Sequence, residues 1–327
     1  EYNKFCGRIK MIITHIMGGL GNQLFQYAVG RALAHKNHTE LKLDITQTEA
    51  DKSSHHSFYR LDVYNIQENF ATAEEIQRQR QVIEPNTQDN FFPEVLDLPD
   101  GVWFYGYWQC EKYFIDIRDI LWREFTLKNP LEKVSGSWRE KILAADCAVS
   151  LHVRHGDYLT PILKNSHGII PHEYYLECIN QLKNFCPNLT LFVFSDDIEW
   201  VRKNLDCGVP MEFVEGCEHD YEEMYLMSLC RHNIIANSSF SWWGAWLNQN
   251  PEKKVFMPST YNITAEGYTV IACDSKTTLL DFPPMMSCII YADDENITTI
   301  AKTIQSVLSQ NFQSIEIILL DANICDN

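Results

Sequence analysis

The second half of the sequence alternates apolar stretches of strand length with stretches of helical periodicity, and this alternation constrains the fold more than any other feature. Strands are expected at residues 147–153, 189–195, 211–216, 233–237 and 254–258, and helices at residues 172–183, 198–205, 221–230 and 240–248. Because strands that alternate with helices form βαβ units, the pattern predicts an α/β fold with a parallel sheet.

The first half begins in the same way, with an isoleucine-rich strand at residues 11–17, a glycine turn and a helix at residues 23–35. A strand with alternating apolar residues follows at 39–45, and a buried strand is expected at 102–107. Two intervening segments are interpreted as a loop (46–60) and a polar helix (71–81). A chain of 327 residues has room for about two domains, so we expect two α/β halves divided near residue 145.

The composition excludes several classes of partner. A net charge of −17 argues against a protein that binds nucleic acid, which requires a basic face. No apolar run approaches the roughly 18 residues of a membrane span, and residues 1–10, expected to be a leader outside the fold, lack the apolar stretch of a secretory signal. The 11 cysteines form no paired motif, which predicts reduced thiols in a cytoplasmic protein and neither a disulfide framework nor a zinc site.

Polar residues follow three strands of the predicted second sheet. They lie at 152–157, at 195–197 and at 237–241. Ligands of parallel α/β sheets bind beyond the carboxyl ends of the strands, so these segments predict one binding edge.

Arg154 is the cation of this edge. Its planar guanidinium suits a diphosphate, and the alternative is a surface ion pair with Asp157. Ser238 and Ser239 begin the next helix, where backbone N–H groups could hold a second phosphate. The alternative for Ser238 and Ser239 is a helix N-cap.

Neither a metal nor a dinucleotide is predicted. His152 and His155 follow one strand at a spacing that disfavours joint ligation, and the adjacent Asp196 and Asp197 have no evident third ligand. The glycine turn 18–22 lacks the last glycine of a dinucleotide fingerprint. At the end of this turn, Asn22 either directs its amide into a crevice or caps the helix.

Aromatic residues have two interpretations. Trp242, Trp243 and Trp246 occur at helical spacing, which favours a buried core. Trp108 and Gln109 follow an aromatic strand and form either a platform for a sugar or part of the core.

Four motifs together resemble glycosyltransferase family 11, the α-1,2-fucosyltransferases. They are GGLGNQLFQYA at 18–28, GYWQ at 106–109, HVRHGDY at 152–158 and NSSFSWW at 237–243. The resemblance implies a GT-B-like pair of Rossmann-type domains, an acceptor-side domain at 11–145 and a donor domain at 146–284. It also implies GDP-β-L-fucose as donor, inverting transfer to the 2-hydroxyl of a terminal galactose, and no metal or other cofactor.

The resemblance also implies roles for individual residues. In the donor domain, Arg154 would hold the β-phosphate of GDP and stabilise the leaving group, His152 would line the nucleotide and Asp196 would contact ribose or guanine. Ser238, Ser239 and Phe240 would form the phosphate wall.

In the first half, the backbone of Gly19 and Gly21 would bind the donor, and Asn22 would lie beside the fucose and the attacking hydroxyl. Trp108 and Gln109 would bind the acceptor. Asp157 is the first candidate for the general base, with a structural pairing to Arg154 as the alternative. His155 replaces the second arginine of the family pattern.

Residues 285–327 resemble the start of a second enzyme, a family 2 glycosyltransferase of GT-A fold, with strands at 286–291 and 315–321 and a helix at 297–310. Asp321 would match the first nucleotide-binding acid of that family, whereas Ala292 replaces its usual proline. The alternative is an ordinary C-terminal βαβ unit of the main fold. The whole protein is expected in the cytoplasm, with a membrane-peripheral place at the inner face of the membrane as the alternative. The competing functions are another GDP-sugar transferase and a non-catalytic binder of glycans or sugar nucleotides.

Overall fold

The computed structural model describes residues 10–50, 58–87, 91–155, 170–261, 263, 265–271 and 273, together with the strands at 286–292 and 315–321. The predicted leader, Asp157 and the helix at 297–310 lie outside these residues, except for Lys10 at the end of the leader.

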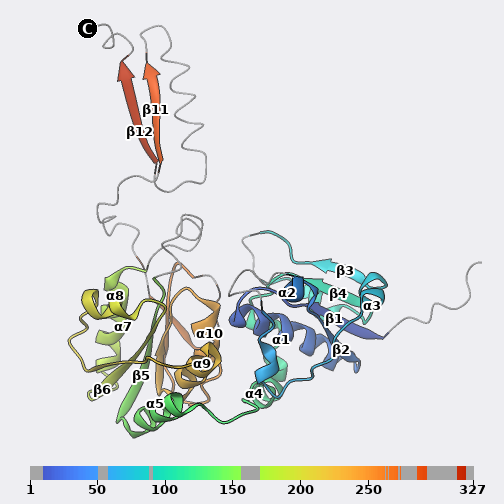
Figure 1. Cartoon of the computed structure of the whole chain (residues 1–327), viewed down its shortest axis with the longest axis horizontal. Helices are drawn as coiled ribbons and strands as arrows, with labels where there is room; N and C mark the ends of the chain where they lie inside the picture. Colours follow the sequence, from blue (N-terminus) through green and yellow to red (C-terminus); the bar gives the residue numbers. More distant parts are fainter. Residues whose placement is uncertain are drawn as a thin grey trace, which may run out of the picture.

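The N-terminal half is built on a four-stranded sheet in the order β2-β1-β4-β3. Every neighbouring pair is parallel, and the register places Ile12 beside both Leu41 and Val102. Helix α1 packs along one face of this sheet (Figure 1). The strands are β1 (Met11–His15), β2 (Glu40–Asp44), β3 (Arg80–Ile83) and β4 (Val102–Tyr105).

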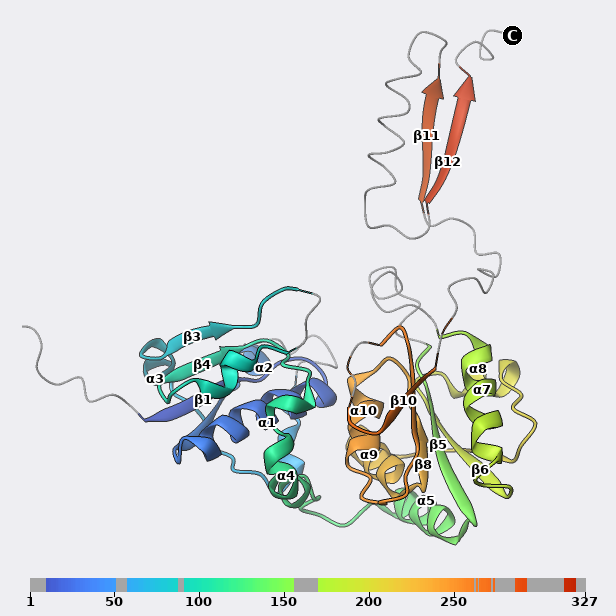
Figure 2. The same ribbon diagram turned by 180° about the vertical axis from the view of Figure 1, so that it is seen from behind.

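The second half is built on a six-stranded parallel sheet in the order β10-β9-β8-β5-β6-β7. Helices α7 and α8 cover one face, and α9 and α10 cover the other (Figures 1 and 2). The predicted α/β class with parallel sheets is therefore confirmed. The strands are β5 (Cys147–Val153), β6 (Leu189–Ser195), β7 (Met211–Phe213), β8 (His232–Ile234), β9 (Val255–Pro258) and β10 (Tyr268–Ile271).

The described α-helices agree with most of the predicted ones. The helix predicted at 172–183 is α7 with the same limits, and the other predicted helices of the second half differ by one or two residues at their ends. The α-helices are α1 (Leu20–Lys36), α2 (Thr46–Ala50), α3 (Ala73–Gln77), α4 (Arg118–Glu124), α5 (Lys133–Ala144), α7 (His172–Lys183), α8 (Ile198–Asn204), α9 (Asp220–Leu229) and α10 (Ser239–Trp246), with short 3-10 helices at Leu61–Val63, Pro93–Asp97, Glu111–Tyr113 and Ile115–Ile117.

Two predictions for the first half are wrong. The segment interpreted as a loop from residue 46 begins with helix α2, and the polar helix predicted at 71–81 is divided into α3 and the edge strand β3. Helix α3 begins at a capping box formed by Thr72 and Glu75. β3 forms because Arg80–Ile83 pair in register with β4, a contact between distant residues that local periodicity does not reveal.

The prediction that every cysteine is reduced is wrong for one pair. Cys147 begins β5, and Cys186 lies just before β6, whose Leu189 pairs with Cys147 in the sheet. This register brings two cysteines 39 residues apart in sequence together, and they form a disulfide. The described residues Cys110, Cys178, Cys207, Cys217, Cys230 and Cys273 are free thiols.

Helix α10 of the second half shares a hydrophobic core with the N-terminal half. The ring of Phe25 on α1 lies 4.6 Å from Trp242 and 4.9 Å from Trp243, and Phe114 stacks on Trp243 at 5.5 Å. Trp246 is buried in the same cluster, which confirms the aromatic core predicted for the three tryptophans. The two sheets thus have separate hydrogen-bond networks but adjoin a common core.

Strands β11 (Met286–Ala292) and β12 (Ile315–Asp321) pair in parallel over seven residues and form a two-stranded sheet of their own. The two predicted strands of the C-terminal segment are confirmed. No helix in the described part of the chain is long and apolar enough to cross a membrane.

Candidate functional site

The predicted charged segments meet at the carboxyl edge of the second sheet, because β5 lies between β6 and β8. The Arg154 guanidinium Nε lies 3.5 Å from Asp196 Oδ2, and the backbone N–H of His155 donates to Asp196 Oδ1 at 2.9 Å. The acid at the end of β6 thus orients the cation at the end of β5. Asp157, the partner expected for Arg154, lies outside the described residues.

His155 is fixed against the start of α8. Its Nδ1 lies 2.9 Å from Asp197 Oδ2, and its ring stacks on Trp200 at 3.9 Å. Asp197 also caps α8 by accepting from the Trp200 N–H at 3.1 Å. His155, which replaces the second arginine of the family pattern, therefore connects the ends of β5 and β6 to the start of α8.

His152 is a buried neutral imidazole beside the site. Burial, followed by the positive charge of Arg154, lowers the pKa of His152 to about 3. Its ring lies 5.8 Å from the Phe240 ring, and Nδ1 has no hydrogen-bond partner among the described residues. The His152 and Phe240 side chains thus lie side by side at this edge of the sheet.

The serines at the start of α10 are engaged within the fold. The Ser238 Oγ accepts from the Phe240 N–H at 3.3 Å, so the N-cap alternative is confirmed for Ser238. The Ser239 hydroxyl instead donates to Asn22 Oδ1 at 2.9 Å. One serine caps the helix, and the other connects the two halves of the molecule.

Asn22 is the centre of this connection. Its Oδ1 accepts from the Gln109 Nε2 at 2.7 Å as well as from Ser239. Gly19, not Asn22, is the N-cap residue of α1, so the helix-cap alternative for Asn22 is wrong. With Oδ1 occupied twice, the Asn22 amide has its Nδ2 donor available, and no described residue accepts from it.

Gly21 allows α1 and α10 to meet. A Cβ placed on Gly21 would lie 2.6 Å from the Ser239 carbonyl carbon and 2.7 Å from the Phe240 nitrogen. Real Cβ atoms do not approach backbone so closely. The backbone at the start of α10, in the second half of the protein, therefore occupies the position beside Gly21.

Trp108 is not a sugar platform in this structure. Its side chain is 0% exposed, with its ring 5.3 Å from Phe104 and 5.9 Å from Tyr113. Positive φ angles at Gly106 and at Trp108 turn the chain so that the indole enters the core. The core alternative is correct for Trp108, whereas Gln109 lies at the connection through Asn22.

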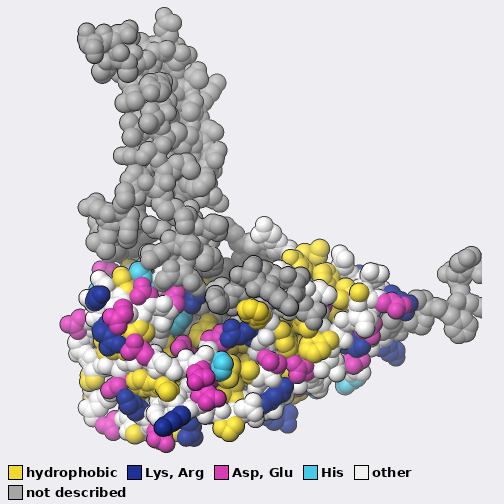
Figure 3. Space-filling view, viewed as in Figure 1, with side chains coloured by type: hydrophobic (Ala, Val, Ile, Leu, Met, Phe, Trp, Pro, Cys, Tyr) yellow, Lys and Arg dark blue, Asp and Glu magenta, His cyan; other side chains and the backbone are white. Residues whose placement is uncertain are grey.

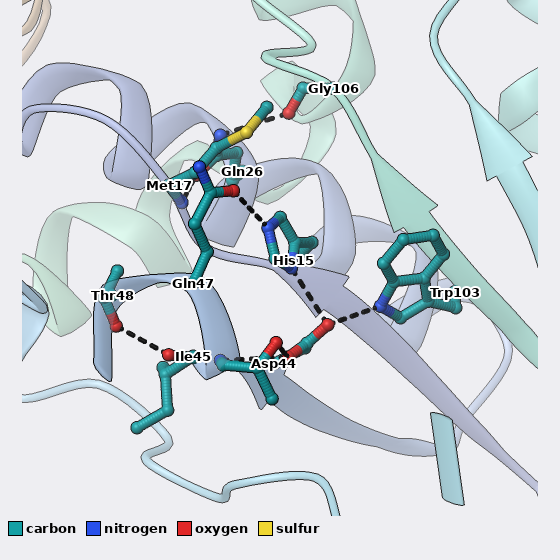
Figure 4. A network of polar contacts seen from close by, with 10 residues as sticks. His15, Met17, Gln26, Asp44, Ile45, Gln47, Thr48, Trp103 and Gly106 are labelled. Atoms are coloured by element: carbon teal, nitrogen blue, oxygen red, sulfur yellow. Dashed lines mark hydrogen bonds and ion pairs between the residues drawn. The ribbon is translucent and has the colours of Figure 1, made fainter. Parts of the chain in front are cut away.

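A polar network at the carboxyl edge of the first sheet was missed from the sequence (Figure 4). His15 Nδ1 lies 2.9 Å from Asp44 Oδ2, which also accepts from the Trp103 indole at 2.8 Å, and His15 Nε2 lies 2.9 Å from Gln47 Oε1. Burial opposes charge on both members of the pair. The hydrogen bonds outweigh it, raising the pKa of His15 and lowering that of Asp44 to about 2. His15 and Asp44 end the observed strands β1 and β2 but lie inside the strands predicted at 11–17 and 39–45, so the strand-end rule did not find them.

Glu223 on α9 was also missed. Burial, together with the negative charges of Asp220 and Glu222, raises the pKa of Glu223 to about 7. The start of the same helix is tied to the N-terminal half, because Asp220 pairs with Arg60. No local sequence signal distinguishes Glu223 from its acidic neighbours.

Among the described residues, one group of three potential metal ligands lies close together: Cys147, Cys186 and His232. It lies where β5 and β8 begin, at the sheet edge opposite Arg154, and its two sulfurs are joined. The absence of a metal requirement stays a prediction.

Comparison with known proteins gives a consistent result. The sequence profile of glycosyl transferase family 11 matches residues 9–266. An alpha-1,2-colitosyltransferase of Escherichia coli is 33% identical over 264 residues (73% of this chain, 88% of the relative). The O-antigen biosynthesis glycosyltransferase WbnK of Escherichia coli is 29% identical over 279 residues (74% and 92%). Galactoside alpha-(1,2)-fucosyltransferase 1 of Saimiri boliviensis boliviensis is 27% identical over 241 residues (70% and 63%).

Among solved structures, fucosyltransferase NodZ from Bradyrhizobium superposes with a TM-score of 0.42 at 12% identity, over 72% of this chain and 92% of NodZ.

Proposed function

Because the chain belongs to glycosyl transferase family 11, we propose that it transfers L-fucose from GDP-β-L-fucose to the 2-hydroxyl of a terminal galactose, with inversion at the anomeric carbon. One observation carries the proposal. Asn22 of the first half binds Ser239 at the start of α10, and the next residue, Phe240, packs on His152, two residues before Arg154. The residues expected beside the sugar and beside the phosphates thus form one continuous set.

Arg154 performs the central step in this proposal. As the bond from the fucose C1 to the β-phosphate oxygen breaks, negative charge develops on GDP, and the guanidinium donates hydrogen bonds to it. The Asp196 carboxylate lies 3.5 Å from Nε and orients the guanidinium at the end of β5. No metal is required, because the arginine supplies the positive charge.

The acceptor hydroxyl attacks C1 on the face opposite GDP through an oxocarbenium-like state. The new bond joins the galactose O2 to C1, and the hydroxyl proton passes to a base. Asp157 stays our candidate for that base. Asn22, whose Oδ1 is fixed by Gln109 and Ser239, directs its amide N–H toward the reacting sugars.

A second donor has specific support. The relative named alpha-1,2-colitosyltransferase supports GDP-colitose, the donor of a sugar that is fucose without its 3-hydroxyl. The name of the relative from O-antigen biosynthesis supports a bacterial surface polysaccharide as the acceptor glycan.

The test is a matrix of donors and acceptors. GDP-fucose and GDP-colitose are each incubated with lactose, N-acetyllactosamine, methyl β-galactoside and its 2-deoxy analogue, and the product linkage is determined by NMR. We expect fucose on O2 of galactose and no product from the 2-deoxy acceptor. Transfer from GDP-colitose but not from GDP-fucose would identify GDP-colitose as the donor. Product from the 2-deoxy analogue would show that the sugar is not transferred to O2 of galactose. Glycan binding that is independent of GDP and without transfer would instead indicate a binding protein.

A further inference from the structure

Two tyrosines at the end of β4 are exposed beside the site. Tyr105 is 38% exposed and Tyr107 is 44% exposed, although Trp108, next in sequence, is fully buried. Hydrophobic side chains gather on the face of the N-terminal half that Figure 3 shows. An exposed tyrosine offers an apolar face and a polar hydroxyl, the combination that a sugar ring with C–H and O–H groups requires.

Tyr107 and Asn22 both lie close to Gly18. A Cβ placed on Gly18 would lie 2.9 Å from Asn22 Nδ2 and 3.5 Å from the Tyr107 Cε1. Any side chain on Gly18 would crowd the Asn22 amide, and the Gly18 φ of 74° is one that residues other than glycine rarely adopt. An aromatic ring and an amide donor thus flank a glycine at the connection between the halves.

The segment that carries Tyr107 is rigidly held. The Glu84 carboxylate accepts from the backbone N–H groups of Tyr107 at 2.6 Å and Trp108 at 3.0 Å. Gln26 of α1 donates to the Gly106 carbonyl at 3.1 Å. Anchored from β3 and from α1, the ring is preorganised, which reduces the entropic cost of binding a ligand.

Tyr105 is supported from behind by the network that was missed from the sequence. Its ring lies 5.2 Å from the His15 ring and 5.7 Å from the Trp103 ring, and Asp44 binds both His15 and Trp103. The buried polar group therefore has a function in positioning an exposed aromatic side chain.

We propose that Tyr107, together with the Asn22 amide, forms the subsite for the terminal galactose of the acceptor, and that Tyr105 forms the subsite for the next sugar. The inference rests on the proposed function and extends it. The galactose places a C–H face on the Tyr107 ring, and one of its hydroxyls accepts from Asn22 Nδ2. This arrangement brings the acceptor to the same amide that faces the donor sugar.

The experiment compares Tyr107→Ala, Tyr107→Phe and Tyr105→Ala with the control Phe185→Ala. Phe185 is 63% exposed and follows α7 at the opposite edge of the second sheet, so its loss reports a general effect of removing a surface ring. Kinetics are measured with methyl β-galactoside and with lactose. Saturation-transfer NMR measures binding of the same galactosides in the presence of GDP, without turnover.

We expect Tyr107→Ala to raise KM for both acceptors about tenfold, a typical effect of removing an aromatic anchor, while KM for the GDP-sugar stays unchanged. Tyr107→Phe should retain most of the acceptor affinity, and Phe185→Ala all of it. Tyr105→Ala should raise KM for lactose and leave that for methyl β-galactoside unchanged.

The outcomes separate the two proposals. If the wild type transfers fucose and Tyr107→Ala keeps its acceptor KM, the subsite is wrong and the function stands. If the wild type transfers nothing but binds galactosides through Tyr107, the function is wrong and the subsite stands. If the wild type neither transfers to galactosides nor binds them, both are wrong.

Discussion

The carboxyl edges of the two sheets differ in chemistry although both belong to parallel α/β units. The edge of the second sheet carries charged groups in mutual contact, Arg154 with Asp196 and His155 with Asp197. The edge of the first sheet presents exposed tyrosines over a buried His15–Asp44 pair. We propose that this difference reflects two tasks: the edge of the second sheet stabilises charge, and the edge of the first sheet orients a neutral ligand.

The largest expected effect is on the charged edge. Arg154→Ala removes the donor that stabilises the leaving diphosphate, and kcat/KM for the GDP-sugar should fall about 1000-fold, the upper range for loss of one such group. The matched control is Arg202→Ala, because Arg202 is an exposed arginine paired with Glu215 at 2.7 Å. Equal activities of the two variants in steady-state assays would show that charge stabilisation is not the task of this edge.

The next largest effect concerns the connection between the edges. Gly21→Ala forces a methyl group into the backbone of Ser239 and Phe240, and the free energy of unfolding should fall by about 1–3 kcal/mol, as for other overpacked sites. The control is Gly136→Ala, a glycine in α5 with open space around its Cα, which should raise stability by about 0.5–1 kcal/mol. Urea denaturation measures both changes. Unaltered stability of Gly21→Ala would contradict the direct contact of α1 with α10.

At the carboxyl edge of the first sheet, Asp44→Asn should weaken the hydrogen bonds that Asp44 makes with His15 and Trp103. The pKa of Asp44 is lowered from 3.8 to about 2 in the folded protein, so its stabilisation is complete above about pH 4 and is lost as the pH falls toward 2. The difference of nearly two units corresponds to about 2 kcal/mol. Denaturation of wild type and variant between pH 2 and 6 should converge at the acid end. Parallel curves over that range would refute the pairing.

Ionisation of Glu223 should change the stability of the protein less than that of Asp44, and should lower it rather than raise it. Its pKa is raised from 4.5 to about 7, so the folded state holds the proton more tightly than the unfolded chain, and stability falls as the pH rises from about 4.5 to 7. Because the side chain is partly exposed, Glu223→Gln should stabilise the protein at pH 8 by only about 1 kcal/mol. Thermal denaturation at pH 5 and pH 8 tests this, and a variant equally affected at both pH values would contradict it.

The smallest effect is expected for the C-terminal segment, which we propose to be the start of a second glycosyltransferase domain. Its two strands form a separate sheet, so deletion of residues 285–327 should leave transfer by the first 284 residues within about twofold of the full chain. An inactive deletion variant that is still folded, as judged by circular dichroism, would assign the segment to the main fold instead.

The sequence was sufficient to predict the position of a residue where that position depends only on the end of a strand or the start of a helix. The rule that ligand-binding residues follow parallel strands led to Arg154 and Asp196, directly after β5 and β6, and to His152, the next-to-last residue of β5, because parallel strands end at the same edge. Capping preferences identified Ser238 in the same way. These positions depend on secondary structure and on little else.

The sequence was insufficient to predict the orientation of a side chain where contacts between distant parts of the chain decide it. Tyr107 and Trp108 are neighbours, and only the turn that Gly106 and Glu84 impose decides which ring is buried. The Cys147–Cys186 disulfide likewise depends on the pairing of β5 with β6 rather than on any spacing.

The tryptophans of α10 also impose an order on the synthesis of the chain. Phe25 and Phe114 leave the ribosome long before Trp242 and Trp243, which complete their packing. At about 5–20 residues per second, the stretch from the end of the first half to Trp246 takes roughly 5–20 s. During that interval the Phe25 and Phe114 rings lack the tryptophans that pack on them in the folded protein.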